Sequence, residues 1–466
     1  MLHIHSNLPV QSHDNSQSET NLILEKISSL QPSDWPTVIE AINSGNAQDR
    51  LIAVMGVRHI LYTFPQDITA EMVAESKVVS TLLWILNWDK TSEIQIESAW
   101  SIIKIASGTA EFVKIVVDAG GVPCISKLDA ASHETLSIPA ILALGNIAKQ
   151  CIEYRNLVIE NQGFDVMVNA AINLKSLTYA YDVIWSLGRL CRFEPPYNEK
   201  FLFQAAYVFF QYIQKIENSG ASIDISDALW SLVSISKYVS LLEVFAFQST
   251  NIIEYFLNFL LKYVKNIEYF EPALAILNNI ASFETATEFL KTKNCIEILV
   301  NILKNMDGNP QKPKFVWFIS HLTAGSKHDI QHFLKNGHIV TSLIQMALFD
   351  TSSKVQIESL RALVNLTYLA DYNQILTLFN SELLSAFMKF LEVEDDECII
   401  LALKGISNFL ACEQNIGKCD FKEWVTLNGT ALDVERLLNH PNEEINQIID
   451  EILETFFDNG DSNSTY

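Results

Sequence analysis

Apolar and polar residues follow a helical period along most of this chain. From about residue 33 to residue 457 apolar side chains recur at intervals of three and four, with breaks at Gly, Pro and Asn. The first helix of this region is predicted near Trp35, because Ser33 and Asp34 are suitable N-caps and Pro36 suits a first helical turn. No stretch alternates as a β-strand would. The pattern predicts an all-α protein.

A short apolar motif recurs inside this helical region at nearly constant spacing. Four copies begin with Trp, at Trp100, Trp185, Trp230 and Trp317, and four begin without it, at Leu142, Ala275, Arg361 and Lys404. The fifth positions of successive copies lie 42 to 45 residues apart, at Lys104, Asn146, Arg189, Ser234, Asn279, His321, Asn365 and Asn408. A period in the low forties is typical of armadillo or HEAT repeats, which stack into a helical solenoid.

Several repeats also carry a glycine after an apolar helix. Gly120-Gly121, Gly163 and Gly337 each follow an apolar helix. We expect a left-handed helix end at these points, because glycine adopts that conformation without steric cost. Such an end turns the chain sharply into the next helix of the stack.

The first and fifth positions of the motif are a candidate binding surface. They lie about one turn apart on one helix face, so stacked repeats place them in parallel rows. A row of Asn amides can both donate to and accept from the backbone of an extended peptide, and indoles form slots for Lys or Arg side chains. The alternative is that the Trp side chains are core residues, since Trp is highly buried on average. Four Trp residues at one phase favour a peptide-reading groove on the concave face, because repeated core positions more often hold Leu or Ile.

Composition narrows the classes of partner. The formal charge of −23 argues against direct nucleic-acid binding, which needs clustered Lys and Arg. It fits either a basic partner or simply a soluble surface. No apolar run is long enough for a membrane span, and the first residues lack the apolar core of a signal peptide, so we expect an intracellular protein. Residues 1–32 and 458–466 are polar and are predicted to be disordered tails.

Catalytic and metal-binding motifs are lacking in the sequence. His328 and His332 are four residues apart on a predicted helix, but no Cys or further carboxylate stands at metal spacing, and a solvated helix face is the favoured interpretation. No phosphate-binding glycine loop, HExxH motif or nucleophile motif is present. We therefore expect no enzyme activity, no cofactor and no metal.

Several segments resemble importin-α, the armadillo adaptor of nuclear import. The segments that carry the resemblance are AINSGNAQDRLIAVMGVRHIL from Ala41, ESAWSIIKIASGTAEFVKIVVDAGGVP from Glu97, ALGNIAKQCIEYRNLVIE from Ala143, EPALAILNNIA from Glu271, FISHLTAGS from Phe318 and ALDVERLLNHPNEEINQIIDEILETFF from Ala431. The likeness covers roughly residues 34 to 457. It implies a right-handed superhelix of about ten armadillo repeats, basic cargo peptides as ligands, importin-β and an export receptor as partners, and a location in both cytoplasm and nucleus.

The resemblance also implies two cargo sites. The larger site, on the second to fourth repeats, would use Trp100, Gly108, Thr109, Asn146 and Trp185, with Trp230 on the next repeat. The smaller site would use Asn279, Trp317 and Asn365, with Thr323 nearby.

This sequence departs from the family pattern at both sites. In the larger site, Lys104 and Arg189 stand where the family has Asn, Leu142 where it has Trp, and Lys149-Gln150 and Lys237-Tyr238 where it has Gly-Asp and Asp-Gly. In the smaller site, Ala275, His321 and Arg361 stand where the family has Arg, Asn and Trp. The family's Arg-rich segment, which recruits importin-β, has no counterpart in residues 1–32, which contain one Lys and no Arg.

Two functions remain open on this basis. The first is a nuclear import adaptor with a degenerate larger site, which the retained Trp and Asn positions favour. The second is an armadillo scaffold without a transport role, which the intruding cations favour, since a cation repels a Lys-rich peptide.

Overall fold

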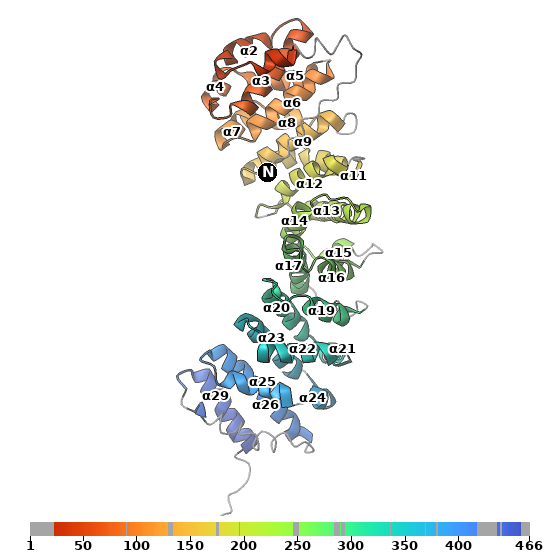
Figure 1. Cartoon of the computed structure of the whole chain (residues 1–466), viewed down its shortest axis with the longest axis vertical. Coiled ribbons are helices and arrows are strands. Elements are labelled where there is room, and N and C mark those ends of the chain that lie inside the picture. Colours follow the sequence, from red (N-terminus) through yellow and green to blue (C-terminus); the bar gives the residue numbers. More distant parts are fainter. Residues whose placement is uncertain are drawn as a thin grey trace, which may run out of the picture. The chain divides into compact units, whose positions relative to one another are not determined.

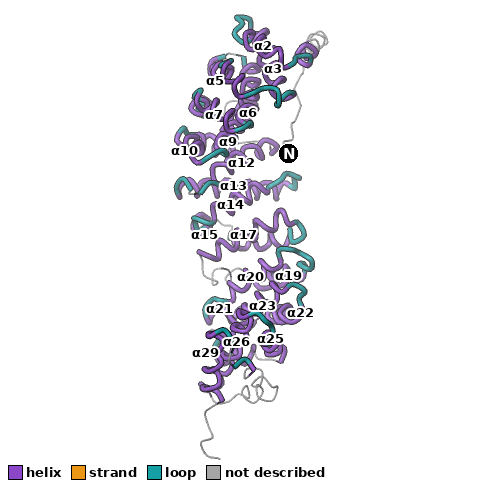
Figure 2. The backbone as a smooth tube through the Cα atoms, turned by 90° about the vertical axis from the view of Figure 1, so that its left-hand side faces the viewer, coloured by secondary structure: helices purple, strands orange, loops and turns teal. Residues whose placement is uncertain are grey.

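The computed structural model describes most of the chain. The described residues are 23–89, 91–128, 134–173, 177–194, 196–245, 251–283, 289, 294–335, 337–368, 370–378, 381–416, 436–438 and 440–457. They are helices joined by short turns, and this described part contains no β-strand (Figures 1 and 2). The expected tail at residues 458–466 lies outside the described residues.

The chain divides into two compact units, which are described separately. The N-unit is Met1–Tyr238 and the C-unit is Val239–Tyr466. Each unit is built from the same repeat of three helices. In the N-unit the repeat is seen in α4 (Ala70–Glu75), α5 (Val78–Trp88) and α6 (Ser92–Ala106). The first helix is short, and the third is longer and carries the motif.

The third helices of the N-unit pack on one another in chain order (Figure 1). They are α3 (Ala47–Thr63), α6, α9 (Glu134–Ala148), α12 (Leu177–Cys191) and α14 (Ser226–Ser236). The other helices of this unit are η1 (Pro32–Asp34), α2 (Trp35–Ala41), α7 (Ala110–Asp118), α8 (Gly121–Ile125), α10 (Ile152–Glu160), α11 (Gly163–Asn173) and α13 (Glu199–Ser219).

The C-unit repeats the arrangement. Its third helices, which again pack in chain order, are α17 (Ile267–Phe283), α20 (Lys312–Thr323), α23 (Ser353–Tyr368), α26 (Asp396–Ile416) and α29 (Glu443–Ile452). The others are α15 (Leu241–Phe245), α16 (Ile252–Lys262), α19 (Cys295–Lys304), α21 (Lys327–Lys335), α22 (Gly337–Phe349), α24 (Tyr372–Leu378), α25 (Ser381–Leu391) and a π-helical turn at Leu453–Phe457. The expected all-α solenoid of armadillo type is confirmed.

The turn between the first and second helix uses one left-handed residue. That residue is Lys77 (φ 52°), Gly120 (φ 77°) and Gln162 (φ 67°) in successive repeats. The expectation that Gly163 would take this conformation is therefore wrong. Gly163 instead starts α11 where a Cβ atom would lie 2.6 Å from the Val158 side chain, so it is needed for close packing.

The N-terminal boundary also differs from the prediction. Residues 23–28 are helical, Ile27 is buried, and the Leu30 side chain approaches Gly56 of α3. These residues are apolar enough to pack on the first repeat, so residues 23–32 do not belong to the disordered tail that was predicted for residues 1–32. The structure describes nothing before residue 23.

Small residues let consecutive third helices approach closely. Ser follows Trp in three copies of the motif, and these three serines, Ser101, Ser186 and Ser231, are fully buried. Each hydroxyl donates to the carbonyl four residues earlier, so no polar group is left unpaired at the contact. The facing residue in the preceding helix is glycine twice: a Cβ on Gly145 would lie 2.9 Å from the Ser186 Cα atom, and one on Gly188 would lie 2.6 Å from Ser231 Oγ.

The close approach of Gly145 on α9 to Ser186 on α12 predicts an effect of substitution on stability. We expect Gly145→Val to lower the free energy of unfolding by about 1–2 kcal/mol, because the added side chain would overlap the α12 backbone. Gly45→Val is the control, since no atom lies within 4 Å of a Cβ at that position. Denaturant unfolding followed by circular dichroism measures both. Equal stability of the two variants would show that α9 and α12 are not packed this closely.

Candidate functional site

The four Trp residues of the motif lie at the surface of their units. Trp230 is 40% exposed and Trp317 is 38% exposed, and Trp100 and Trp185 are partly exposed. By contrast, Trp35, which is outside the motif, is buried at 3%. The alternative in which the motif tryptophans form the core is therefore wrong. Three of them stand at the same position on α6, α12 and α14 of the N-unit, and Trp317 stands on α20 of the C-unit.

The indole of Trp185 is already in contact with cations of the protein itself. The guanidinium carbon of Arg189 lies 4.5 Å from the ring centroid, and Lys149 Nζ lies 5.9 Å from it. Both distances are within the range of a cation–π interaction. The slot that was expected to hold a Lys of a cargo peptide is thus lined by the chain's own Arg and Lys.

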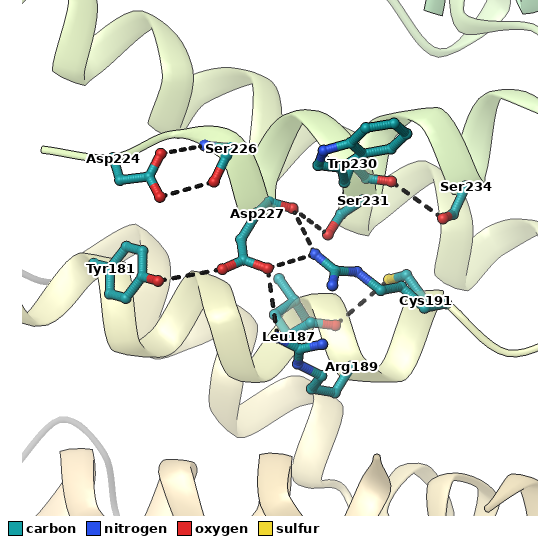
Figure 3. A network of polar contacts seen from close by, with 11 residues as sticks. Tyr181, Leu187, Arg189, Cys191, Asp224, Ser226, Asp227, Trp230, Ser231 and Ser234 are labelled. Atoms are coloured by element: carbon teal, nitrogen blue, oxygen red, sulfur yellow. Dashed lines mark hydrogen bonds and ion pairs between the residues drawn. The ribbon is translucent and has the colours of Figure 1, made fainter. Parts of the chain in front are cut away.

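Asp227 contacts this arginine and, more closely, its neighbour Arg192 (Figure 3). Arg192 Nη2 donates to Asp227 Oδ1 at 2.5 Å, and Arg189 Nη2 lies 3.5 Å from the same oxygen. The Tyr181 hydroxyl donates to the other carboxylate oxygen at 3.3 Å. Burial and the neighbouring Asp227 charge raise the pKa of Tyr181 to about 12, so this hydroxyl remains a donor at neutral pH.

Asn146 is engaged in the same region. It is buried, and its Oδ1 atom accepts a hydrogen bond from Lys149 Nζ at 2.9 Å. Burial, followed by repulsion from Arg189, lowers the pKa of Lys149. The acceptor half of this amide is therefore already bonded within the protein.

The remaining predicted residues of the larger site lie near the end of α6. Gly108 and Thr109 are exposed in the turn that leads into α7. Lys104, one turn after Trp100, lies with its Nζ 4.9 Å above the Tyr62 ring of α3. The surface that carries the Trp column in the N-unit therefore also carries Lys104, Lys149 and Arg189.

The smaller predicted site in the C-unit differs in charge and in access. Trp317 packs against His321, with ring centroids 4.1 Å apart and ring planes inclined by 57°. Asn279 is partly exposed on α17, and Asn365 Nδ2 on α23 donates to the Ser320 carbonyl at 2.9 Å. Thr323 is 1% exposed and its hydroxyl donates to the Ser320 carbonyl at 2.8 Å, so this side chain offers no surface to a ligand.

Carboxylate groups lie beside the C-unit surface that carries Trp317. Glu358 lies 3.3 Å from Arg361 Nε, and Glu397 lies 2.6 Å from Arg361 Nη2. Burial is the main cause of the lowered pKa of His321. The negative charge of Glu358 opposes this shift, and the positive charge of Arg361 adds to it. His321 is consequently neutral at pH 7, and the indole beside it faces no full positive charge from that ring.

Three acidic residues in this arrangement were missed by sequence reasoning. Glu97, Asp227 and Glu358 each stand three residues before the first position of their motif copy, on the next turn of the same helix face. Glu97 pairs with Arg58 at 2.7 Å, Asp227 with Arg192, and Glu358 with Arg361. Their constant spacing from the Trp column is the signal that would have found them.

Other candidate sites gain no support. Among the described residues no group of three metal-binding side chains comes together, and the His328 and His332 rings lie 5.6 Å apart on their own. None of the described helices combines the length and apolar character needed to cross a bilayer.

Comparison with known proteins gives distant but extended similarity. No protein-family profile matches the chain. Importin subunit alpha-1b of Oryza sativa subsp. japonica is 25% identical over 436 residues, which are 91% of this chain and 78% of that protein. Importin subunit alpha-1a of the same plant is 25% identical over 310 residues, and the match spans 65% of this chain and only 56% of the relative. The crystal structure of an engineered protein from the Northeast Structural Genomics Consortium has a TM-score of 0.66 at 20% identity and covers 91% of this chain and 98% of its own.

These matches agree with the geometry of the repeats. Stacked three-helix repeats with exposed Trp residues at one repeat phase make it an armadillo-type repeat protein. Within that class its sequence is similar to the importin-α subunits, at 25% identity over 436 residues of one of them, in line with the resemblance seen in the sequence.

Proposed function

We propose that the chain is an importin-α-like adaptor that carries proteins with basic localisation signals between cytoplasm and nucleus. The observation that carries the proposal is the exposed Trp317, which stands between Asn279 and Asn365 at one repeat phase of a chain related to importin-α subunits. A basic cargo peptide, importin-β and an export receptor are the partners that this function requires.

The C-unit surface suits a short basic peptide. The exposed indole of Trp317 provides a slot for the aliphatic stem of a Lys or Arg. Asn365 retains its carbonyl oxygen as an acceptor for peptide N–H groups while its amide nitrogen is anchored to α20. Glu358 and Glu397 supply negative charge beside this slot, although Arg361 offsets part of it.

The N-unit surface is unsuited to the same ligand. Arg189 and Lys149 occupy the neighbourhood of the Trp185 ring, and Lys104 lies on the same column two repeats earlier. Each would repel a Lys-rich peptide by about 1 kcal/mol or more in a partly desolvated site. The adaptor would then hold basic signals mainly through the C-unit.

The second candidate is an armadillo scaffold without a transport role. The observation that favours it is Arg189 over the Trp185 ring, an internal contact in place of a cargo contact. Both candidates bind a peptide, but only the adaptor also binds the import receptor.

Size-exclusion chromatography of a three-component mixture separates the two. Full-length chain, a fluorescent cargo with a basic signal, and importin-β are expected to elute as one complex if the adaptor proposal holds. A complex of chain and cargo that excludes importin-β would support the scaffold instead, and no complex with the cargo would refute the adaptor.

His321 gives a pH-dependent prediction for the C-unit surface. Because its pKa is lowered, His321 is neutral at pH 7.5 and gains a proton only at a pH below the ordinary pKa of histidine. The new charge would lie against Trp317, so we expect affinity for a Lys-rich peptide to fall on the order of fivefold as the pH is lowered from 7.5 through the lowered pKa of His321. His321→Asn should flatten this dependence. The same pH response in both proteins would exclude His321 as its source.

A further inference from the structure

We propose that the basic cluster of the N-unit, defined as Lys104, Lys149, Arg189 and Arg192, binds an extended acidic peptide of a partner protein. The carboxylate of a Glu or Asp side chain would lie between Lys149 and Arg189 at the Trp185 ring. The inference rests on the proposed function in one respect only, that the third-helix surface accommodates an extended peptide.

The cluster is unusual in a chain of this charge. Asp and Glu number 55 against 32 Lys and Arg, yet Lys149, Arg189 and Arg192 gather around Trp185 and Asp227. Lys104 stands at the motif position of Arg189 two repeats earlier, on α6. One carboxylate, Asp227, is shared between Arg189 and Arg192. In the described part of the chain neither Lys104 nor Lys149 forms an ion pair with a carboxylate. The cluster therefore holds more positive charge than its surroundings neutralise.

The contacts of the two lysines leave room for an anion. Lys104 Nζ is 4.9 Å from the Tyr62 ring, and Lys149 Nζ donates to the neutral oxygen of Asn146. An ammonium group has three donors, and an aromatic ring or an amide provides much weaker compensation than a carboxylate. The lowered pKa of Lys149, caused by burial and then by Arg189, agrees with an ammonium that lacks a counter-charge.

Trp185 and Asp227 orient the arginine in this cluster. The ring supports the guanidinium from one side at 4.5 Å, and Asp227 Oδ1 lies 3.5 Å from its Nη2 atom. A guanidinium held in this way presents its remaining donors in a fixed plane, which suits a carboxylate. Because Lys149 directly follows α9, Trp185 and Arg189 lie on α12, and Asp227 lies on α14, the ligand would cross consecutive third helices as an extended chain.

Fluorescence anisotropy with three matched peptides tests the proposal on the full-length protein. One ten-residue labelled peptide carries Glu at alternate positions, a second carries Gln and a third carries phosphoserine at the same positions. At low salt we expect the Glu peptide to bind about tenfold more tightly than the Gln peptide, and this difference should shrink at high salt. Similar affinity of the Glu and Gln peptides would overturn the proposal, as would tight binding of the phosphoserine peptide alone.

Paired charge removals locate the site. Lys104→Gln combined with Lys149→Gln breaks no ion pair of the described structure, and we expect it to weaken the Glu peptide about tenfold. The control, Lys114→Gln with Lys200→Gln, removes two exposed cations of the same unit and should leave the affinity unchanged. Equal loss in both variants would mean that the peptide responds to overall charge and not to the cluster.

The proposed function is tested separately in the same assay with a Lys-rich peptide and Trp317→Ala. If Trp317→Ala weakens the Lys-rich peptide while the Glu peptide fails to bind, the acidic-peptide inference is wrong and the adaptor proposal stands. Binding of the Glu peptide without binding of the Lys-rich peptide supports the inference and refutes the adaptor proposal.

Discussion

Replacing both Lys104 and Arg189 by Asn is expected to strengthen binding of a Lys-rich peptide to the N-unit by about thirtyfold at low salt. Two repulsive charges, each contributing about 1 kcal/mol or more, are removed from the path of the peptide. The change also uncovers the Trp185 ring, which lies 4.5 Å from the Arg189 guanidinium, and releases Asp227 from one of its two cations. The double substitution thus replaces two repulsive cations by an exposed Trp185 ring that lies near the Asp227 carboxylate.

The measurement needs a background in which the C-unit does not bind. We therefore compare Trp317→Ala with the triple variant that adds Lys104→Asn and Arg189→Asn, by anisotropy of a short labelled Lys-rich peptide in a salt series. The gain should be larger at low salt, since exposed charges are screened within about 10 Å at 0.1 M. Lys114→Asn with Lys200→Asn, added to the same background, controls for overall charge. If affinity at low salt does not change, Lys104 and Arg189 do not face the ligand, and the carried-over groove positions are wrong at these repeats.

The second large effect concerns the C-unit. Trp317→Ala is expected to weaken the Lys-rich peptide by about 2 kcal/mol, or roughly thirtyfold, because an exposed aromatic that receives a cation stem is the usual centre of binding energy. Trp88→Ala is the matched control: Trp88 ends α5, a second helix of the N-unit, and is 72% exposed. Loss of binding in both variants would indicate nonspecific attachment to exposed indoles, and retention in Trp317→Ala would exclude this surface as the basic-signal site.

The repeat architecture was predictable because one helix face repeats along the whole chain. A spacing of 42 to 45 residues between motif copies fixes which positions are equivalent, and equivalent positions in stacked repeats share an environment. This is why the exposure of Trp230 and Trp317 followed from their phase alone.

What individual side chains contact was not predictable in the same way. Arg189 reaches back over Trp185 on its own helix, Asp227 comes from α14, and Tyr62 under Lys104 comes from α3. These partners depend on rotamers and on helix spacing, which the repeat period does not specify. Left-handed Gln162 and the packed helix at residues 23–28 have the same origin, because tertiary contacts there override the local preference that the sequence displays.

Calorimetric titration of the full-length chain with a Lys-rich signal peptide at low salt shows whether basic signals bind only at the C-unit surface. We expect saturable binding of one peptide per chain, at the C-unit surface around Trp317, because the basic cluster excludes the peptide from the N-unit. The same titration of the Lys104→Asn, Arg189→Asn variant should approach two peptides per chain. Two peptides bound by the unmodified chain, or no saturable binding at all, would contradict binding at the C-unit surface alone.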